Sequence, residues 1–501
     1  MKNNTFGNTM WRSILITAVT LFSPFISRAQ ECNCSATFEW VVNTFEKNDA
    51  GFQYVIDKKG LDDYQKHTAA FKEKVKDITK LADCQFAVYN WLKYFRPGHI
   101  GISIKGQQFA NGGNAKLNAD SIRRVYSGAK TINLSRAQLM STLNKKKNKN
   151  PIEGIWTDGR YVIGIIGDDK DVVKYSGFII KADSIYWMPK QIKVDLTLDA
   201  GKKIFAADYY MQNHSKQVTQ GYLVDGTNNL MVLYNAYWTR VDPEKPSTKK
   251  ELILTEFSKS QKPFIEKLSD KTLYLRIPAF LADQKHIIDS SLLKYDSLIK
   301  ATPNLIIDIR NGTGGSDASY ANIMPYLYTS PVRSVNVQLL ATELNAAAFE
   351  KYAKQYDDTS NINYCLRMAQ NMRKHIGAFI SNSNEIATTD TSKAVVLPNP
   401  KKVGIICNHN NGSTDEQFLL EAKQSTKVKV FGRSTFGSLD ISNMNFIDSP
   451  DGKFQLGYCM SKSYRIPDFT IDGVGIQPDY FIDDAIKDTD WIDYTQSVLE
   501  N

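Results

Sequence analysis

Hydrophobic positions recur with a helical period through the first part of the chain. Between residues 35 and 96, apolar residues repeat at spacings of three and four, as at Phe38, Val41 and Phe45. Pro97-Gly98 ends this pattern, and an alternating apolar run over residues 100–104 follows, which is typical of a strand. We therefore expect an N-terminal helical domain over residues 30–105, with His99 at the junction between its last helix and that strand.

The pattern changes to short alternating or apolar runs between residues 106 and 245. Turn residues such as Asp225-Gly226 separate these runs, which indicates strands joined by tight connections. A small antiparallel β domain is therefore predicted, beginning near Gly154. The expected strands cover residues 161–166, 175–180, 185–188 and 230–234.

Strands alternate with helices after a linker at Pro243 to Pro246. Apolar strand-like runs at residues 273–277 and 305–309 flank a helical pattern over 287–298, and this alternation predicts a mainly parallel α/β core over residues 246–501. Residues 341–385 interrupt the alternation with a helical pattern of their own, and we expect an inserted segment there. The predicted fold class is thus α/β and multidomain.

Ser413 lies between a predicted buried strand and a predicted helix. The apolar run over residues 403–407 ends in a polar turn, and apolar residues at helical spacing follow from Phe418. The N-terminus of a helix favours developing negative charge, which suits a nucleophilic serine. Serine is also a preferred helix N-cap, so the local pattern allows either role.

Four motifs occur around this serine in a recognisable order. They are Asp308-Ile-Arg-Asn-Gly-Thr-Gly-Gly-Ser316, Ser413-Thr-Asp-Glu416, Gly432-Arg-Ser-Thr-Phe-Gly437 and Gly473-Val-Gly-Ile-Gln-Pro-Asp479. Over residues 251–485, this order resembles the tail-specific (C-terminal processing) serine peptidases and their tricorn-core relatives. The resemblance implies a ββα-spiral core of the Clp and crotonase type and peptide hydrolysis by an acyl-enzyme route. A PDZ domain, common in that family, is not recognisable in residues 106–245.

The resemblance also suggests which residues assist Ser413. Tail-specific members carry a lysine base directly after the T-x-G turn, but that position holds Ser438 here. Tricorn-type members use a histidine from the N-terminal region, and Pro97-Gly-His99 resembles that element, so His99 is the expected base and His409 the alternative. Asp472 stands where the family has a relay glutamate, and Asp440 is a second candidate acid.

The remaining groups of the predicted site are backbone donors and one carboxylate. Gly314 or Gly315, together with Thr414, would supply N–H groups to the oxyanion, because glycine allows the backbone to approach a carbonyl closely. Glu416, one helical turn after Ser413, is expected to support the site without reacting. The relay needs no metal or other cofactor.

Residues 1–29 have the pattern of a secretory signal peptide, with Lys2 and Arg12 before an apolar stretch and Ser27-Arg-Ala29 at its end. That stretch is too short to span a bilayer, so we expect an exported protein, periplasmic or extracellular, without a membrane span. In an oxidising compartment Cys84 could pair with Cys32 or Cys34, and Cys34 is favoured because it adjoins the first helix.

Charge excludes one class of partner. The net charge of +9 falls to +6 without the three basic residues of the expected signal peptide, and the one basic run, Lys145 to Lys149, has no interleaved aromatic residues. No nucleic-acid partner is therefore expected. Two functions fit the sequence: an exported serine endopeptidase acting on peptides or unfolded protein segments, or a catalytically inactive peptide- or lipid-binding protein on the same fold. The oligomeric state stays open.

Overall fold

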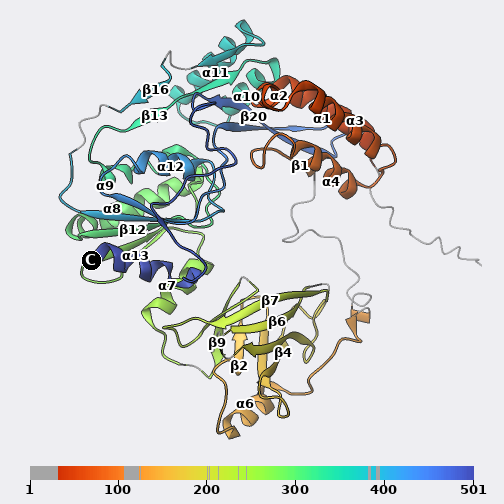
Figure 1. The fold of residues 1–501 in the computed structure, drawn as a ribbon, viewed down its shortest axis with the longest axis vertical. Coiled ribbons are helices and arrows are strands. Elements are labelled where there is room, and N and C mark those ends of the chain that lie inside the picture. The colour runs from red at the N-terminus through yellow and green to blue at the C-terminus, as the bar shows by residue number, and fades with distance from the viewer. Residues whose placement is uncertain are drawn as a thin grey trace, which may run out of the picture.

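The fold is that of a computed structural model, which describes residues 32–105, 123–124, 126–199, 201, 204–212, 214–234, 236–243, 245–381, 385–390 and 395–501 (Figure 1). The predicted signal peptide over residues 1–29 lies outside these ranges. Helices and sheets are mixed along the chain, as expected, and they form several units. Within the described residues, no helix combines the length and the apolar composition that a membrane crossing requires.

The α/β core is built on a six-stranded sheet with the order β10-β11-β12-β17-β18-β21. All neighbouring strands are parallel except β10 and β11. Alternate residues of β12 face opposite sides, so that Leu305 and Ile307 pack with helices α8 and α12 while Ile306 packs with α7 and α13. The strands are β10 (Phe264–Lys267), β11 (Thr272–Arg276), β12 (Asn304–Asp308), β17 (Lys402–Cys407), β18 (Val428–Gly432) and β21 (Tyr480–Phe481).

Helices cover both faces of this sheet, which is why its central strands are apolar throughout. They are α7 (Lys249–Lys259), α8 (Lys285–Ala301), α9 (Met324–Leu327), α12 (Thr414–Ala422) and α13 (Trp491–Glu500). A two-stranded ribbon, β13 (Arg333–Val335) with β16 (Ala387–Thr389), leads toward the inserted segment.

The N-terminal helices share a core with two distant parts of the chain (Figure 1). A second sheet, β1-β20-β14-β15 with β19 paired to β20, carries residues from all three parts. The expected domain over residues 30–105 is therefore one portion of a larger lobe, and the helices of the 341–385 insertion pack in that lobe. Its elements are α1 (Cys34–Asn48), α2 (Phe52–Lys59), α3 (Leu61–Lys74), α4 (Leu81–Leu92), β1 (Gly101–Ile104), β14 (Val337–Leu340), α10 (Glu343–Ala353), α11 (Thr359–Lys374), β15 (Phe379–Ser381), β19 (Ile441–Asp448) and β20 (Phe454–Ser463).

A disulfide joins Cys34 to Cys84, with 5.5 Å between the Cα atoms. This is the pair that the sequence favoured, and it ties the start of α1 to α4. Chain entropy predicts about 4 kcal/mol of stabilisation for a loop of 50 residues. Cys32, the alternative partner, is buried as a free thiol.

Eight described strands close into an antiparallel barrel in which each strand pairs with the next and β2 pairs with β9. The barrel begins at Gly154, as expected. One predicted strand, residues 185–188, is wrong: this segment is irregular because Trp187 leaves the sheet to stack on His214, with 3.8 Å between ring centroids. The strands are β2 (Gly154–Thr157), β3 (Val162–Gly167), β4 (Lys174–Lys181), β5 (Ile192–Asp199), β6 (Ile204–Tyr210), β7 (Lys216–Leu223), β8 (Leu230–Leu233) and β9 (Ala236–Asp242), preceded by helix α6 (Arg136–Lys145).

Lys193 lies inside the barrel, 1% exposed. Its ammonium group is 4.3 to 4.5 Å from the ring centroids of Tyr161, Trp187 and Tyr209, and it donates to the Tyr210 carbonyl. Burial lowers the pKa of Lys193 to about 7. A free lysine keeps its proton to about pH 10.4, so the unfolded chain binds more protons than the folded chain between these values.

Stability should therefore rise with pH between about 7 and 10, since unfolding takes up a proton in that range. The free energy of unfolding should increase by about 4 kcal/mol across this pH range. Lys193→Met should remove this pH dependence and stabilise the barrel at pH 7. Calorimetric unfolding of the whole chain at pH 7 and 9 measures the effect, with exposed Lys181→Met as the matched control. Equal pH dependence in wild type and Lys193→Met would contradict the prediction.

Candidate active site

Ser413 occupies a sharp turn between β17 and α12. Its backbone has φ +60° and ψ −124°, a conformation that residues other than glycine rarely adopt. The Ser413 N–H donates to the Ser438 carbonyl at 3.0 Å and to Glu416 Oε2 at 3.2 Å. The side chain is half-buried and stands at the start of α12, so the helix N-terminus and the strained turn both present it.

Glu416 holds the turn that follows β18 against Ser413. This fully buried carboxylate accepts hydrogen bonds from the Thr435 hydroxyl at 2.5 Å, from Gly437 N at 2.7 Å and from Ser438 N at 2.8 Å. Burial raises the pKa of Glu416, and these hydrogen bonds oppose the rise. Glu416 therefore fixes the shape of the site, in keeping with the supporting role expected of it.

Glu416→Gln should damage both stability and activity. An amide offers one acceptor oxygen in place of two, and its NH₂ group would face buried N–H donors that then lack a partner. We expect a loss of about 3 kcal/mol in the free energy of unfolding. Denaturant unfolding measures it against Glu256→Gln, an exposed change on α7. Equal stability of the two variants would show that the Glu416 carboxylate does not hold the turn.

His99 is half-buried beside the second sheet, with φ +54°. Its Nδ1 lies 2.8 Å from the carbonyl oxygen of Ile441, the first residue of β19. A carbonyl oxygen only accepts, so Nδ1 carries the proton and Nε2 keeps a free lone pair. Burial lowers the pKa of His99, the charge of Arg96 lowers it further, and the hydrogen bond to Ile441 opposes them. The geometry thus gives a neutral imidazole with Nε2 able to accept a proton.

A buried ion pair holds the backbone of His99. Arg96 donates to Asp49 Oδ1 at 2.8 Å and to Oδ2 at 2.6 Å, and its Nη2 also donates to the His99 carbonyl at 2.9 Å. Cys459 N donates to Asp49 Oδ2 at 3.0 Å, which links this pair to β20. Sequence reasoning did not identify Asp49 or the role of Arg96. The sequence shows only that Arg96 directly precedes the Pro97-Gly-His99 element.

The segments of His99 and Ser413 meet at Ser438. A Cβ atom on Gly98 would lie 2.6 Å from Ser438 Oγ, so glycine is needed for this approach. Ser438 in turn accepts the Ser413 N–H. Although both residues are described, no hydrogen bond joins the two side chains. A long side chain at position 438 would therefore collide with the Gly98-His99 segment.

In the part of the chain that the structure describes, no hydrogen bond joins Asp472 to His99. Its carboxylate accepts from the backbone N–H groups of Leu439 at 2.6 Å, Asp440 at 2.7 Å and Ile441 at 3.1 Å. Asp472 therefore holds the strand whose Ile441 carbonyl orients His99. Burial raises the pKa of Asp472, and the charge of Asp440 adds to this.

Asp440, the second candidate acid, also binds residues other than His99. It forms a buried ion pair with Arg465 at 2.8 Å and accepts from Ile471 N at 2.6 Å and Asp472 N at 2.8 Å. Each of the two aspartates thus binds backbone N–H groups of the other's segment. Together they clamp residues 439–441 to residues 471–472.

The glycine turn after β12 lies directly against Ser413. Gly314 has φ +83°, and a Cβ atom there would fall 2.6 Å from Ser413 Cβ and 3.0 Å from Thr414 N. No acceptor among the described residues binds the Thr414 N–H. Under the turn, burial raises the pKa of Asp415 to about 7, while hydrogen bonds from Asn411 and the Gly314 N–H oppose the rise. Asp415 Oδ1 is buried without a hydrogen-bond partner among the described residues, and sequence reasoning did not single this residue out.

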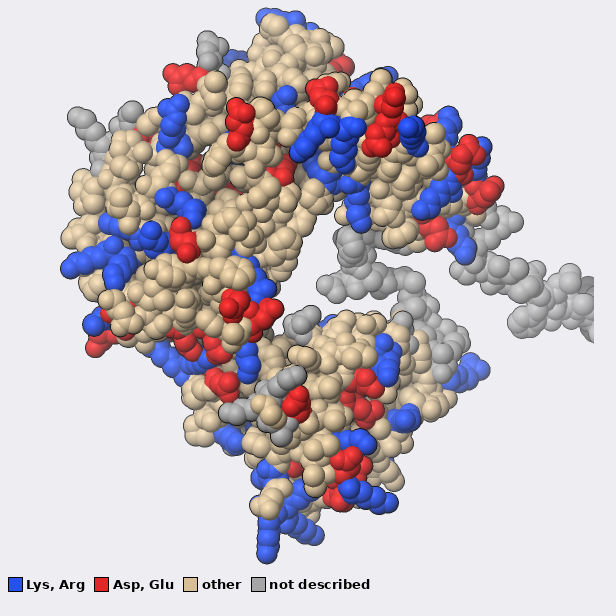
Figure 2. All heavy atoms as spheres, viewed as in Figure 1, with Lys and Arg blue, Asp and Glu red and all other residues tan. Residues whose placement is uncertain are grey.

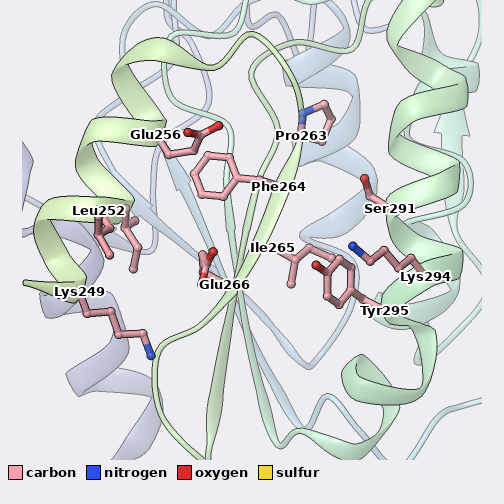
Figure 3. Close-up of a pocket in the computed structure, with 11 residues that line it drawn as sticks. Lys249, Leu252, Glu256, Pro263, Phe264, Ile265, Glu266, Ser291, Lys294 and Tyr295 are labelled. Carbon is pink, nitrogen blue, oxygen red and sulfur yellow. The ribbon is translucent and has the colours of Figure 1, made fainter.

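His409 and the cavity near α7 lie apart from this arrangement. The His409 ring is exposed and contacts Phe436 at 5.6 Å between centroids. A cavity of about 530 Å³ lies between α7, β10 and α8, lined by residues such as Phe264, Glu266 and Lys294 (Figure 3). It contains none of the predicted site residues, so cavity size alone does not locate the chemistry.

Comparison with known proteins finds a family match for the segment that contains Ser413. Residues 271–482 match the model of peptidase family S41. No curated protein sequence matches the chain. Among solved structures, mature CPAF aligns at 10% identity over 93% of this chain and 96% of its own, with a TM-score of 0.48. The photosystem II D1 C-terminal processing protease aligns at 11% over 94% and 98%, with a TM-score of 0.38.

A lipoprotein from Streptococcus agalactiae aligns at 12% identity over 94% of this chain and 96% of its own, with a TM-score of 0.37. Because these TM-scores are below 0.5, the assignment rests on the matched segment. That segment contains Ser413, Glu416, Asp472 and the glycine turn, the residues that carried the resemblance to tail-specific peptidases. The chain is a serine-type peptidase, and its residues 271–482 match peptidase family S41.

Proposed function

We propose that the protein is an exported endopeptidase that cleaves peptides or unfolded protein segments through an acyl-enzyme on Ser413, with His99 as the base. This proposal rests on one observation: the segments of Ser413 and His99, two residues with positive φ, both contact Ser438. Ser413 is presented by its positive-φ turn, and His99 is held with Nε2 free to accept a proton. Family membership supports peptide or protein substrates.

In the proposed mechanism, His99 Nε2 takes the Ser413 hydroxyl proton as Oγ attacks the scissile carbonyl carbon. The imidazolium then keeps its Nδ1–H bond to the Ile441 carbonyl. It returns the Nε2 proton to the leaving amine as the C–N bond breaks. A water molecule then attacks the ester carbonyl carbon while giving a proton to Nε2. Nε2 returns this proton to Ser413 Oγ as the ester C–O bond breaks and the acid leaves. Because no hydrogen bond joins Ser413 and His99 in the described structure, substrate binding must tighten this contact.

Asp472 acts in this proposal as a positioning residue. Its three backbone hydrogen bonds fix residues 439–441, and the Ile441 carbonyl in turn fixes the His99 ring. Thr414 and either Gly314 or Gly315 are the proposed oxyanion donors, since the glycine turn lies against Ser413 and Thr414. Loss of Asp472 would therefore impair catalysis through the position of the base.

Three further features support the proposal. The mainly parallel sheet with helices on both faces fits the expected ββα-spiral core. The Cys34–Cys84 disulfide fits an oxidising compartment, which supports export by residues 1–29 to the periplasm or the extracellular space. The face seen in Figure 2 mixes basic and acidic side chains without a continuous basic band, in keeping with a protein substrate and not a nucleic acid.

The pH dependence of kcat/KM tests the assigned base. His99 must be neutral to accept a proton, and burial lowers its pKa, so activity should be full above the lowered value and fall below it. The acid limb of the profile is therefore expected at a pH below 6.5, the ordinary histidine value. Hydrolysis of a fluorogenic peptide between pH 4 and 9 measures it. An acid limb above pH 6.5 would contradict His99 as the base.

A further inference from the structure

We propose that the Ser438 hydroxyl is a further catalytic group, which passes the proton of Ser413 to His99 Nε2. This relay rests on the proposed function, since it needs Ser413 as the nucleophile and His99 as the base, and it adds a third side chain between them. Ser438 stands where tail-specific peptidases carry their lysine. A hydroxyl cannot replace that lysine as the base, but it accepts one proton while it donates another.

The backbone of Ser438 is fixed on both sides. Its N–H donates to Glu416 Oε2 at 2.8 Å, and its carbonyl accepts the Ser413 N–H at 3.0 Å. The next N–H along the chain, that of Leu439, donates to Asp472 Oδ1 at 2.6 Å. Because these bonds use only main-chain groups, they hold Ser438 beside the nucleophile and leave its hydroxyl free to take part in the chemistry.

The Ser438 side chain lies between the two glycines that precede the nucleophile and the base. A Cβ atom on Gly98 would fall 2.6 Å from Ser438 Oγ, and a Cβ atom on Gly412 would fall 3.8 Å from Ser438 Cβ. Gly98 directly precedes His99, and Gly412 directly precedes Ser413. The hydroxyl therefore lies against the His99 segment, while the Cβ of the same residue faces the Ser413 segment.

Two complementary polar groups at this place lack a partner among the described residues. The Ser438 hydroxyl forms no hydrogen bond to them, although the residue is only 6% exposed. His99 Nε2 forms none either, since the hydrogen bond of this ring to the Ile441 carbonyl uses Nδ1. Polar groups inside proteins pair with one another, so an O–H donor and an imidazole acceptor on adjoining segments fit as partners.

The charged groups around His99 favour a neutral relay. Arg96 donates to the His99 carbonyl, and its guanidinium is balanced by the two hydrogen bonds to Asp49. A cation at position 438 would add positive charge beside this pair, whereas a hydroxyl adds none. Glu416, which binds the Ser438 N–H, already accepts four hydrogen bonds among the described residues, so His99 is the free acceptor for the relayed proton.

Two protons move in the relay as Ser413 Oγ attacks the scissile carbonyl carbon. The Ser413 O–H bond breaks and its proton goes to Ser438 Oγ, while the Ser438 O–H bond breaks and that proton goes to His99 Nε2. Ser438 is a hydroxyl again at the end of the step, and the charge of the imidazolium balances the oxyanion formed on the substrate. The imidazolium then protonates the leaving amine, as in the proposed mechanism.

A proton inventory on wild type and Ser438→Ala tests the relay. We expect kcat of the variant to fall by about 100-fold with little change in KM, because the hydroxyl acts only in the transition state. In mixtures of H₂O and D₂O, kcat/KM of the wild type should depend quadratically on the deuterium fraction, since two protons move together. Ser438→Ala should give a straight line, and the matched control Ser434→Ala, whose hydroxyl donates to Gln477, should give the wild-type curve.

The outcomes separate the relay from the proposed function. Ser438→Ala with wild-type activity, or with a loss of activity but an unchanged inventory, would overturn the relay, because the hydroxyl would then have no role or only a structural one. A straight line for the wild type, with Ser413→Ala inactive and His99→Ala strongly impaired, would overturn the relay and leave the proposed function intact. Activity that survives in folded Ser413→Ala would refute the proposed function and the relay with it.

Discussion

Ser413→Ala is expected to lower kcat for peptide hydrolysis by at least about 10⁴-fold, because no other group in the site can form the acyl-enzyme. The variant should fold normally, since its backbone hydrogen bonds to Ser438 and Glu416 use the N–H and not the hydroxyl. KM should change little, because the hydroxyl acts in the transition state and not in binding.

The control for this variant is Ser434→Ala, in the loop after β18, whose hydroxyl donates to Gln477 Oε1. Its activity should stay within about twofold of wild type. Circular dichroism and thermal unfolding establish that both variants fold. If folded Ser413→Ala kept more than a few per cent of the activity, Ser413 would not be the nucleophile.

His99→Ala is expected to lower kcat by about 10³-fold, with the hydroxyl of Ser413 left without a base. The second histidine near the nucleophile offers a matched control. His409 precedes Ser413 by four residues, but its ring is exposed and contacts Phe436, so His409→Ala should retain activity within about twofold of wild type. Steady-state kinetics on one fluorogenic peptide compare the two variants.

The acid limb of the pH profile separates loss of the base from a structural effect. If residual activity in His99→Ala no longer falls below pH 6.5, the titrating group was His99. The opposite pattern, an active His99→Ala and an inactive His409→Ala, would transfer the role of base to His409.

Local patterns predicted the parts of the site that depend on neighbouring residues. The strand, turn and helix around Ser413 follow from residues 403–420, and the structure has β17 and α12 there. Glu416 was predicted because it lies one helical turn from Ser413, and its contacts to the Thr435 turn agree with the supporting role. The position of His99 at a helix-to-strand junction was also predictable, since Pro97-Gly98 stops the helix.

The groups that orient His99 were not predictable because they come from distant segments. The Ile441 carbonyl is 342 residues away from His99, and a backbone acceptor leaves no mark on the sequence. The Asp49–Arg96 pair joins the end of α1 to the loop after α4 across 47 residues. Asp472 was selected by the family pattern, but which atoms its carboxylate binds depends on how residues 439–441 pass it.

In the overall architecture, too, local features were predictable and contacts between distant segments were not. The barrel was predicted as a small β domain from its short strands, whereas its closure depends on β2 pairing with β9, a contact between its ends. The N-terminal helices and the 341–385 insertion each had an apolar face, as at Phe38 and Met368, without any sign that the two faces pack in one core. Periodicity reveals that a face is buried but not which partner covers it.

Active-site labelling tests the central claim most directly. The wild-type protein, treated with a fluorophosphonate that reacts with activated serines, is digested and the adduct is located by mass spectrometry. Activation of Ser413 by His99 predicts one adduct, on Ser413, that is lost in Ser413→Ala and forms at least about 100-fold more slowly in His99→Ala. An adduct on another serine, or equal labelling rates in wild type and His99→Ala, would contradict it.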